Sequence, residues 1–185
     1  MKRKINFVII LSIVFFVIIG YLLSDDFYYK KALRDNQLKS SDEVFNWVSK
    51  HHINHSCIIT HPYASPRHLM ENHKRLWCDE GAMVAAILIS NLGKKTELVD
   101  MYGYDNISHH TILRVLENNK WINYDFSFKL IDKDYISSAI AGKIKLKEVR
   151  TRPYPKLYNK IVNFNFFLKK IIFFIRGINE NDFVK

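Results

Sequence analysis

Three side chains of the types that act together in thiol catalysis occur in the order Cys78, His110 and Asp125. Cys78 stands directly before residues 79–91, a run of alanine and aliphatic residues that predicts a buried helix. At the start of a helix, unpaired N–H groups and the positive end of the helix dipole stabilise a thiolate and can hold a developing oxyanion. On position alone Cys78 could equally be structural, because cysteine is among the most buried residue types.

Asn118 and Asn119 predict the turn of a β-hairpin, because asparagine tolerates the positive φ that a two-residue turn requires. Gly93 is placed to end the helix that follows Cys78. We therefore expect a helix followed by three strands, over residues 96–102, 110–117 and 120–126.

The hairpin register selects between two adjacent histidines. A two-residue turn places Ile112 opposite Asp125, so His110 and Asp125 are diagonal neighbours on one face of the sheet. His109 falls on the other face, among apolar pairs that are expected to form core. A slip of one residue would reverse this choice.

The arrangement predicts a catalytic triad with a cysteine nucleophile. His110 would accept the thiol proton of Cys78, and Asp125 would hold the imidazole in the useful tautomer. The thiolate would attack a carbonyl and form an acyl-thioester that is released to water or to an amine. Besides the Cys78 N–H, the candidate oxyanion donors are Trp47 and Asn72. No cofactor is expected.

The first half of the chain carries further helix signals. Ser40 and Glu43 fit a capping box. They precede an apolar face at helical spacing, formed by Val44, Trp47 and Val48. A loop over 51–66 and a short helix around 67–75 follow. A helical first half before an antiparallel sheet is typical of an α+β fold.

Several segments resemble the bacterial transglutaminase-like domain over residues 41–128. They are residues 42–48, 66–70, 76–82, Gly93, and 110–115 with 121–125. The resemblance implies a papain-like fold in the broad sense, with a cysteine helix packed on an antiparallel sheet. It also implies acyl-transfer chemistry on amides or esters by Cys78, His110 and Asp125. The chain departs from the family pattern at the residue before the cysteine and at the residues after the histidine and the aspartate, which concerns the substrate groove.

The N-terminus carries an apolar run over 5–23 behind three basic residues, which predicts an uncleaved transmembrane helix. A cleaved signal peptide is the alternative. The basic residues at the start favour a single-pass protein in the cell membrane, with the globular part outside the cytoplasm.

The chain therefore divides into four parts. Residues 1–24 are expected to form a cytoplasmic tail and membrane anchor, 25–39 a juxtamembrane spacer, 40–150 the catalytic domain, and 151–185 a basic, aromatic helical segment. On a helix, Ile161 to Ile175 would present an apolar stripe. That stripe could pack on the domain or lie in the membrane interface.

Composition narrows the class of function. The net charge of +10 invites a nucleic-acid partner, but the basic residues are spread along the chain and are densest at its apolar ends, which favours a membrane surface. The histidines between 51 and 61, with Cys57, match no zinc spacing, so no metal is expected. The predicted function is that of a membrane-anchored thiol enzyme acting on a peptide, protein or other amide-bearing substrate. The alternative is an inactive transglutaminase-like module that binds a protein or an envelope polymer.

Overall fold

A five-stranded antiparallel sheet and four helices make up the described fold. The computed structural model describes residues 2–51, 65–72, 76–106, 108–132, 146–154 and residue 168. The helices are α1 (Lys2–Asp35), α2 (Ser41–His51), α3 (Pro66–Asn72) and α4 (Cys78–Asn91). The strands are β1 (Thr96–Gly103), β2 (Ser108–Glu117), β3 (Lys120–Asp125), β4 (Leu130–Asp132) and β5 (Leu146–Pro153), in the sheet order β4-β3-β2-β1-β5. This arrangement is α+β, as predicted.

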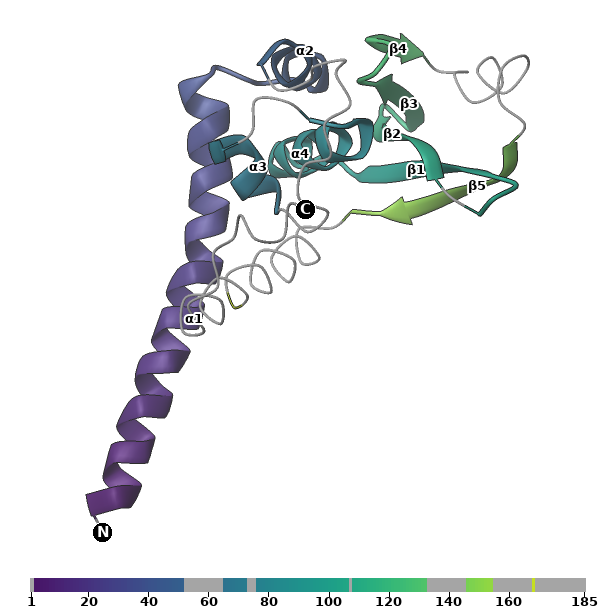
Figure 1. Cartoon of the computed structure of the whole chain (residues 1–185). Coiled ribbons are helices and arrows are strands. Elements are labelled where there is room, and N and C mark those ends of the chain that lie inside the picture. The colour runs from purple at the N-terminus through teal and green to yellow at the C-terminus, as the bar shows by residue number, and fades with distance from the viewer. Residues whose placement is uncertain are drawn as a thin grey trace.

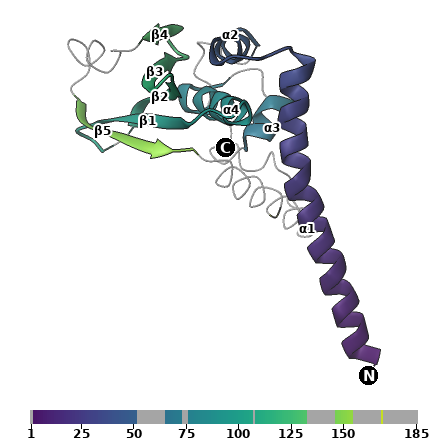
Figure 2. The ribbon, with the colours of Figure 1, turned by 180° about the vertical axis from the view of Figure 1, so that it is seen from behind.

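Helix α4 lies at the centre of the molecule, between the sheet and the other helices (Figures 1 and 2). Its alanine and aliphatic residues are buried on all sides, as the sequence predicted. They share one core cluster with Leu98 of β1 and Leu113 of β2. The helix ends at Asn91, and Gly93, two residues later, has a φ of +87° that favours glycine. Cys78 therefore begins a helix whose side chains are mostly buried.

The capping box of α2 is confirmed. The Glu43 N–H donates to Ser40 Oγ at 3.2 Å, and the Ser40 N–H donates to Glu43 Oε2 at 3.0 Å. Val44 and Val48 of the apolar face are fully buried. This helix packs on α4 and also contacts the sheet, where Phe45 lies against the ring of Tyr124 of β3 and the Tyr124 hydroxyl donates to Asp42.

The hairpin between β2 and β3 has the predicted turn and register. Asn118 and Asn119 both have positive φ values, of 49° and 61°. Leu113 pairs with Tyr124, and Val115 pairs with Ile122. These pairs belong to the core cluster that covers α4, so the apolar face of the hairpin is the inner face, as expected.

The short edge strand β4 and the opposite edge strand β5 were not predicted. β5 pairs antiparallel with β1 and crosses the boundary that the sequence placed between residues 150 and 151. Half of its residues are charged, and it lacks the alternation of polar and strongly apolar residues that marks a half-buried strand. The helix predicted over 161–175 lies outside the described residues, apart from Leu168.

The prediction of a transmembrane helix is corrected. Within the part of the chain that the structure describes, no helix is both long enough and apolar enough to cross a bilayer. The sequence predicted a separate helix over the apolar run 5–23. In the structure this run is the first part of α1, a single helix of 34 residues. The helix continues through the segment 25–39 that was expected to be a spacer, as far as Asp35.

The second part of α1 belongs to the folded domain. Tyr29 and Leu33 are 1% and 6% exposed and join the core cluster around α4. The Arg67 guanidinium of α3 lies 3.5 Å from the buried carboxylate of Asp25 and stacks on the ring of Tyr28. The first part of α1 projects away from the domain (Figure 1). The position of the domain relative to a membrane stays a prediction.

Candidate active site

Cys78 is the first residue of α4, and its thiol is free and half-buried. The preceding residue, Trp77, is extended, with φ −73° and ψ 170°. Its N–H donates to Glu80 Oε2 at 3.0 Å, and its carbonyl accepts the Gly81 N–H at 2.8 Å. The backbone on both sides of the sulfur is therefore fixed by the first turn of the helix.

His110 lies on β2 with only 8% of its surface exposed. It pairs with Met101 of β1, whereas the next paired residues are Tyr102 and Ser108. His109 is thus the extra residue of a β-bulge, a feature that re-aims neighbouring side chains. The imidazole Nε2 of His110 lies 2.6 Å from Asp125 Oδ2.

Asp125 is completely buried at the end of β3. Its Oδ1 accepts the backbone N–H groups of Ser127 at 2.8 Å and Phe128 at 3.1 Å. Its other oxygen faces His110, so both oxygens have partners and the carboxylate orientation is fixed. The ring of Phe128 also lies edge-on to the imidazole, with 5.8 Å between the ring centroids.

The charge state of His110 follows from these neighbours. Burial lowers the pKa of His110, but hydrogen bonds and charge interactions with Asp125 and Cys78 outweigh it and raise that pKa to about 9. The imidazole is therefore protonated at neutral pH, and a cation stands beside the thiol.

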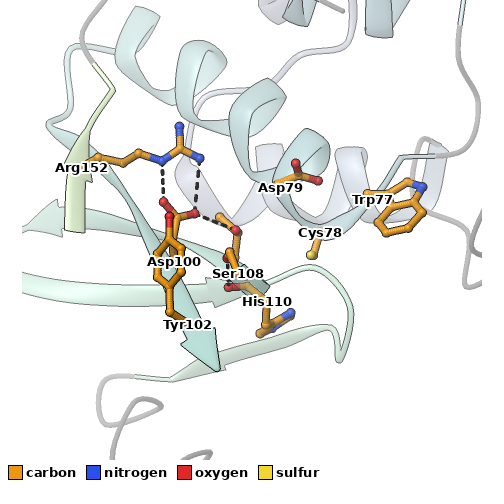
Figure 3. A pocket seen from close by; sticks show the side chains of 9 residues that line it. Trp77, Cys78, Asp79, Asp100, Tyr102, Ser108, His110 and Arg152 are labelled. Carbon is orange, nitrogen blue, oxygen red and sulfur yellow. Dashed lines mark hydrogen bonds and ion pairs between the residues drawn. The ribbon is translucent and has the colours of Figure 1, made fainter. Parts of the chain in front are cut away.

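A cavity of about 370 Å³ opens beside the thiol. In Figure 3 the Cys78 sulfur points toward the His110 imidazole, while Asp100 and Arg152 stand on the far wall. The residues that line the cavity are Trp77, Cys78, Asp79, Asp100, Tyr102, Ser108, His110, Thr111 and Arg152. The thiol and the imidazole thus face a space in which a substrate can bind.

The far wall was not predicted from the sequence. Asp100 is 5% exposed, and its Oδ1 accepts the Thr111 hydroxyl at 2.7 Å. Arg152 donates to the same carboxylate through Nε at 2.6 Å and Nη2 at 3.3 Å. A charged residue inside the apolar strand 96–102 was the available signal for Asp100. No comparable signal marked Arg152, because its strand was not expected.

Some predicted site residues are elsewhere or outside the described residues. The Trp47 indole N–H donates to Asn36 Oδ1 at 3.1 Å, and Trp47 does not line the cavity. Asn72 ends α3, but its side chain is outside the description, as are the side chain of His109 and the histidine-rich residues 52–61 with Cys57. The structure brings together Cys78, His110 and Asp125.

The chain has a limited resemblance to a solved structure. No family model matches the chain, and no curated protein matches it. Among solved structures, the chain resembles the crystal structure described as "a Putative Cysteine Protease" from Cytophaga hutchinsonii. The TM-score is 0.44 at 15% identity, over 74% of this chain and 55% of that chain. The chain spans about half the length of that protein.

Proposed function

We propose that the chain is a cysteine-nucleophile hydrolase or acyltransferase of the transglutaminase-like kind, acting on amide or ester bonds. One observation carries the proposal. The thiol of Cys78 stands at the start of a buried helix, facing a histidine whose Nε2 lies 2.6 Å from a fully buried aspartate. Acyl transfer by a thiol needs a nucleophile next to a base, and an acid that orients the base. Cys78, His110 and Asp125 are arranged in this order.

The reaction begins from the thiolate–imidazolium pair. The Asp125 carboxylate is hydrogen-bonded to Nε2 of His110, so Nδ1 is the ring nitrogen available to the thiol. The thiolate of Cys78 attacks the substrate carbonyl, and the carbonyl oxygen becomes an oxyanion. The Cys78 N–H, at the start of α4, is placed to hold that charge.

The acyl-thioester then forms as the leaving group departs with a proton from the His110 imidazolium. The neutral imidazole next removes a proton from water or from an amine. The activated acceptor attacks the thioester, and the Cys78 sulfur leaves as a thiolate beside the His110 imidazolium, which restores the starting pair. Asp125 keeps the ring oriented through both steps, because its other oxygen is held by two backbone N–H groups.

The proposal is tested by acylation of the full chain with p-nitrophenyl acetate. We expect a burst of nitrophenol and an acetyl group on Cys78 in the mass spectrum. His110→Ala should slow the acylation by about 10²-fold or more, the usual loss when a positioned base is removed. Cys78→Ser should abolish the burst.

His109→Ala is the matched control, because it removes an imidazole from the adjacent residue of the same strand. It should acylate at close to the wild-type rate. Acetylation at other residues, or equal rates in the two histidine variants, would contradict the triad. A chain that is not acylated at all would favour the inactive binding module.

A further inference from the structure

The turn between β3 and β4 carries an exposed phenylalanine beside the His110–Asp125 pair. Asp125 ends β3, and its Oδ1 accepts the N–H groups of Ser127 and Phe128 at 2.8 and 3.1 Å. The Phe128 backbone is therefore fixed to the same carboxylate that binds His110. The Phe128 ring lies edge-on to the imidazole, with 5.8 Å between the centroids, and the residue is 66% exposed.

Neither turn formation nor core packing accounts for this aromatic side chain. Turns usually contain glycine, proline, asparagine, aspartate or serine. Phe126, two residues earlier, is fully buried, whereas Phe128 contributes little to the core because most of its surface stays in water. The position of Phe128 beside the imidazole therefore points to a role in the site.

Leu130 extends the apolar surface along β4. It pairs with Asp125, and paired residues of an antiparallel ladder project to the same face of the sheet. Leu130 is 49% exposed and lies on the face that holds Asp125. We call Phe128 and Leu130 together the apolar patch. Isolated exposed apolar residues are common, whereas groups of them beside a reactive site are typical of ligand-binding surfaces.

The sheet order places the apolar patch on one side of His110 and the polar wall of the cavity on the other. In the order β4-β3-β2-β1-β5, His110 is on the central strand β2. The patch follows β3 and continues on β4, whereas Asp100 and Arg152 belong to β1 and β5 (Figure 1). A substrate at the thiol therefore meets polar groups toward one edge of the sheet and apolar groups toward the other.

Proton transfer decides which part of the substrate lies nearest to the patch. When Cys78 expels the leaving group, the leaving atom takes the proton of the His110 imidazolium. That atom must lie within hydrogen-bond reach of the His110 ring, and the group attached to it continues past the ring. Since Phe128 contacts this ring, the leaving group is the part of the substrate closest to the patch.

We propose that Phe128 and Leu130 are specificity-determining residues that bind an apolar leaving group. This inference rests on the proposed function. The substrate class is therefore an amide or ester whose amine or alcohol part carries an aliphatic or aromatic group next to the bond that Cys78 breaks. Burial of that group against the patch removes apolar surface from water, which favours binding.

The experiment measures the acetylation of Cys78 in the full chain by S-ethyl thioacetate and S-hexyl thioacetate, which differ only in the alkyl leaving group. The Cys78 thiolate bonds to the carbonyl carbon, the bond from that carbon to the alkyl sulfur breaks, and the alkyl thiolate takes the His110 proton. Mass spectrometry of the chain gives the second-order rate constant of acetylation. We expect S-hexyl thioacetate to react about tenfold faster in wild type, the factor for burial of roughly two methylene groups.

Variants of the patch test its part in this preference. Phe128→Ala should reduce the preference to about threefold or less and leave the S-ethyl rate within about threefold of wild type, because it removes only apolar contact surface. Phe128→Leu should keep most of the preference, since it keeps an apolar side chain, and Leu130→Ala should reduce it. Phe27→Ala is the matched control. Phe27 is 64% exposed on α1, so its removal should leave the preference unchanged.

The outcomes separate the specificity from the thiol chemistry. Equal rates with both thioesters in wild type, or an unchanged preference in Phe128→Ala, overturn the specificity and leave the thiol chemistry standing. An equal loss for both thioesters in Phe128→Ala also overturns it, and would show that Phe128 only positions His110. Thermal unfolding shows whether each variant is folded, and if Phe128→Ala is not, Leu130→Ala decides in its place. If neither thioester acetylates Cys78 in wild type, the proposed function is overturned as well.

Discussion

At the scale of single residues, Asp125 has a different partner for each of its carboxylate oxygens. Backbone N–H groups hold Oδ1, and His110 lies on Oδ2. The backbone N–H groups therefore hold the Asp125 carboxylate in place while its negative charge stabilises the protonated His110 imidazole. Two measurable consequences follow from the negative charge, one for the titration of the imidazole and one for stability.

The first prediction concerns the titration of His110. The hydrogen bonds to Asp125 and Cys78 raise its pKa from 6.5 to about 9, against the effect of burial. Asp125→Asn keeps the shape of the side chain and removes its charge, so the pKa should fall toward 6.5. Nuclear magnetic resonance titration of the imidazole measures this directly. A midpoint that stays near 9 in the variant would show that Asp125 does not set the charge of His110.

The second prediction follows by linkage. A pKa that is higher in the folded state stabilises the fold fully below pH 6.5 and stops stabilising it as the pH rises through about 9. The wild type should lose about 3 kcal/mol of unfolding free energy across this window. Asp125→Asn should lose less, and comparing the two removes the contribution of other titrating groups. Urea unfolding at pH 6 and pH 9.5 gives the numbers, and parallel pH dependences would contradict the assignment.

At the scale of secondary-structure elements, the turn at Asn118 and Asn119 sets which histidine faces Asp125. Both residues have positive φ, a conformation that costs ordinary residues about 1 kcal/mol or more. Asn119→Ala should therefore lower the unfolding free energy by about 1 kcal/mol, whereas Asn119→Gly should not lower it. Chemical denaturation of both variants checks this. Equal losses would mean that the asparagine side chain, and not its backbone conformation, stabilises the turn.

The same elements show what the sequence could predict. The hairpin parity, the buried helix and the capping box all depend on residues near one another in the chain, and each appears as a short pattern. β5 has no such pattern, because its residues meet β1 only after about fifty intervening positions, as in the Arg152–Asp100 bond. The cysteine, histidine and aspartate could therefore be predicted from sequence, and the far wall of the cavity could not.

The extent of α1 was missed for a different reason. Its charged residues beyond position 24 resemble a polar spacer when the sequence is considered alone. They are interrupted by Tyr29 and Leu33, which recur at helical spacing and are buried against the domain. The pairing of Asp25 with Arg67 depends on the position of α3, which no local pattern shows.

At the scale of the whole molecule, the end of α1 should behave as part of the domain. Removing residues 1–36 deletes Tyr29 and Leu33, which should cost about 3–6 kcal/mol of unfolding free energy at the usual value for buried apolar side chains. Removing only residues 1–23 is the matched control, and it should leave stability nearly unchanged. Thermal unfolding of both fragments measures the difference. Similar melting temperatures would show that α1 adds nothing to the core.

The position of β5 has a consequence for the order in which the chain emerges from the ribosome. Synthesis runs from the N-terminus, so Cys78, His110 and Asp125 all leave the ribosome before Arg152. Until β5 adds to β1, the Asp100 carboxylate lacks its guanidinium, and an unpaired carboxylate resists burial. In the nascent chain, the sheet beside the thiol is therefore less stable until the last described strand pairs with β1. The Asp100–Arg152 ion pair therefore forms only after the residues that surround Cys78 have been synthesised.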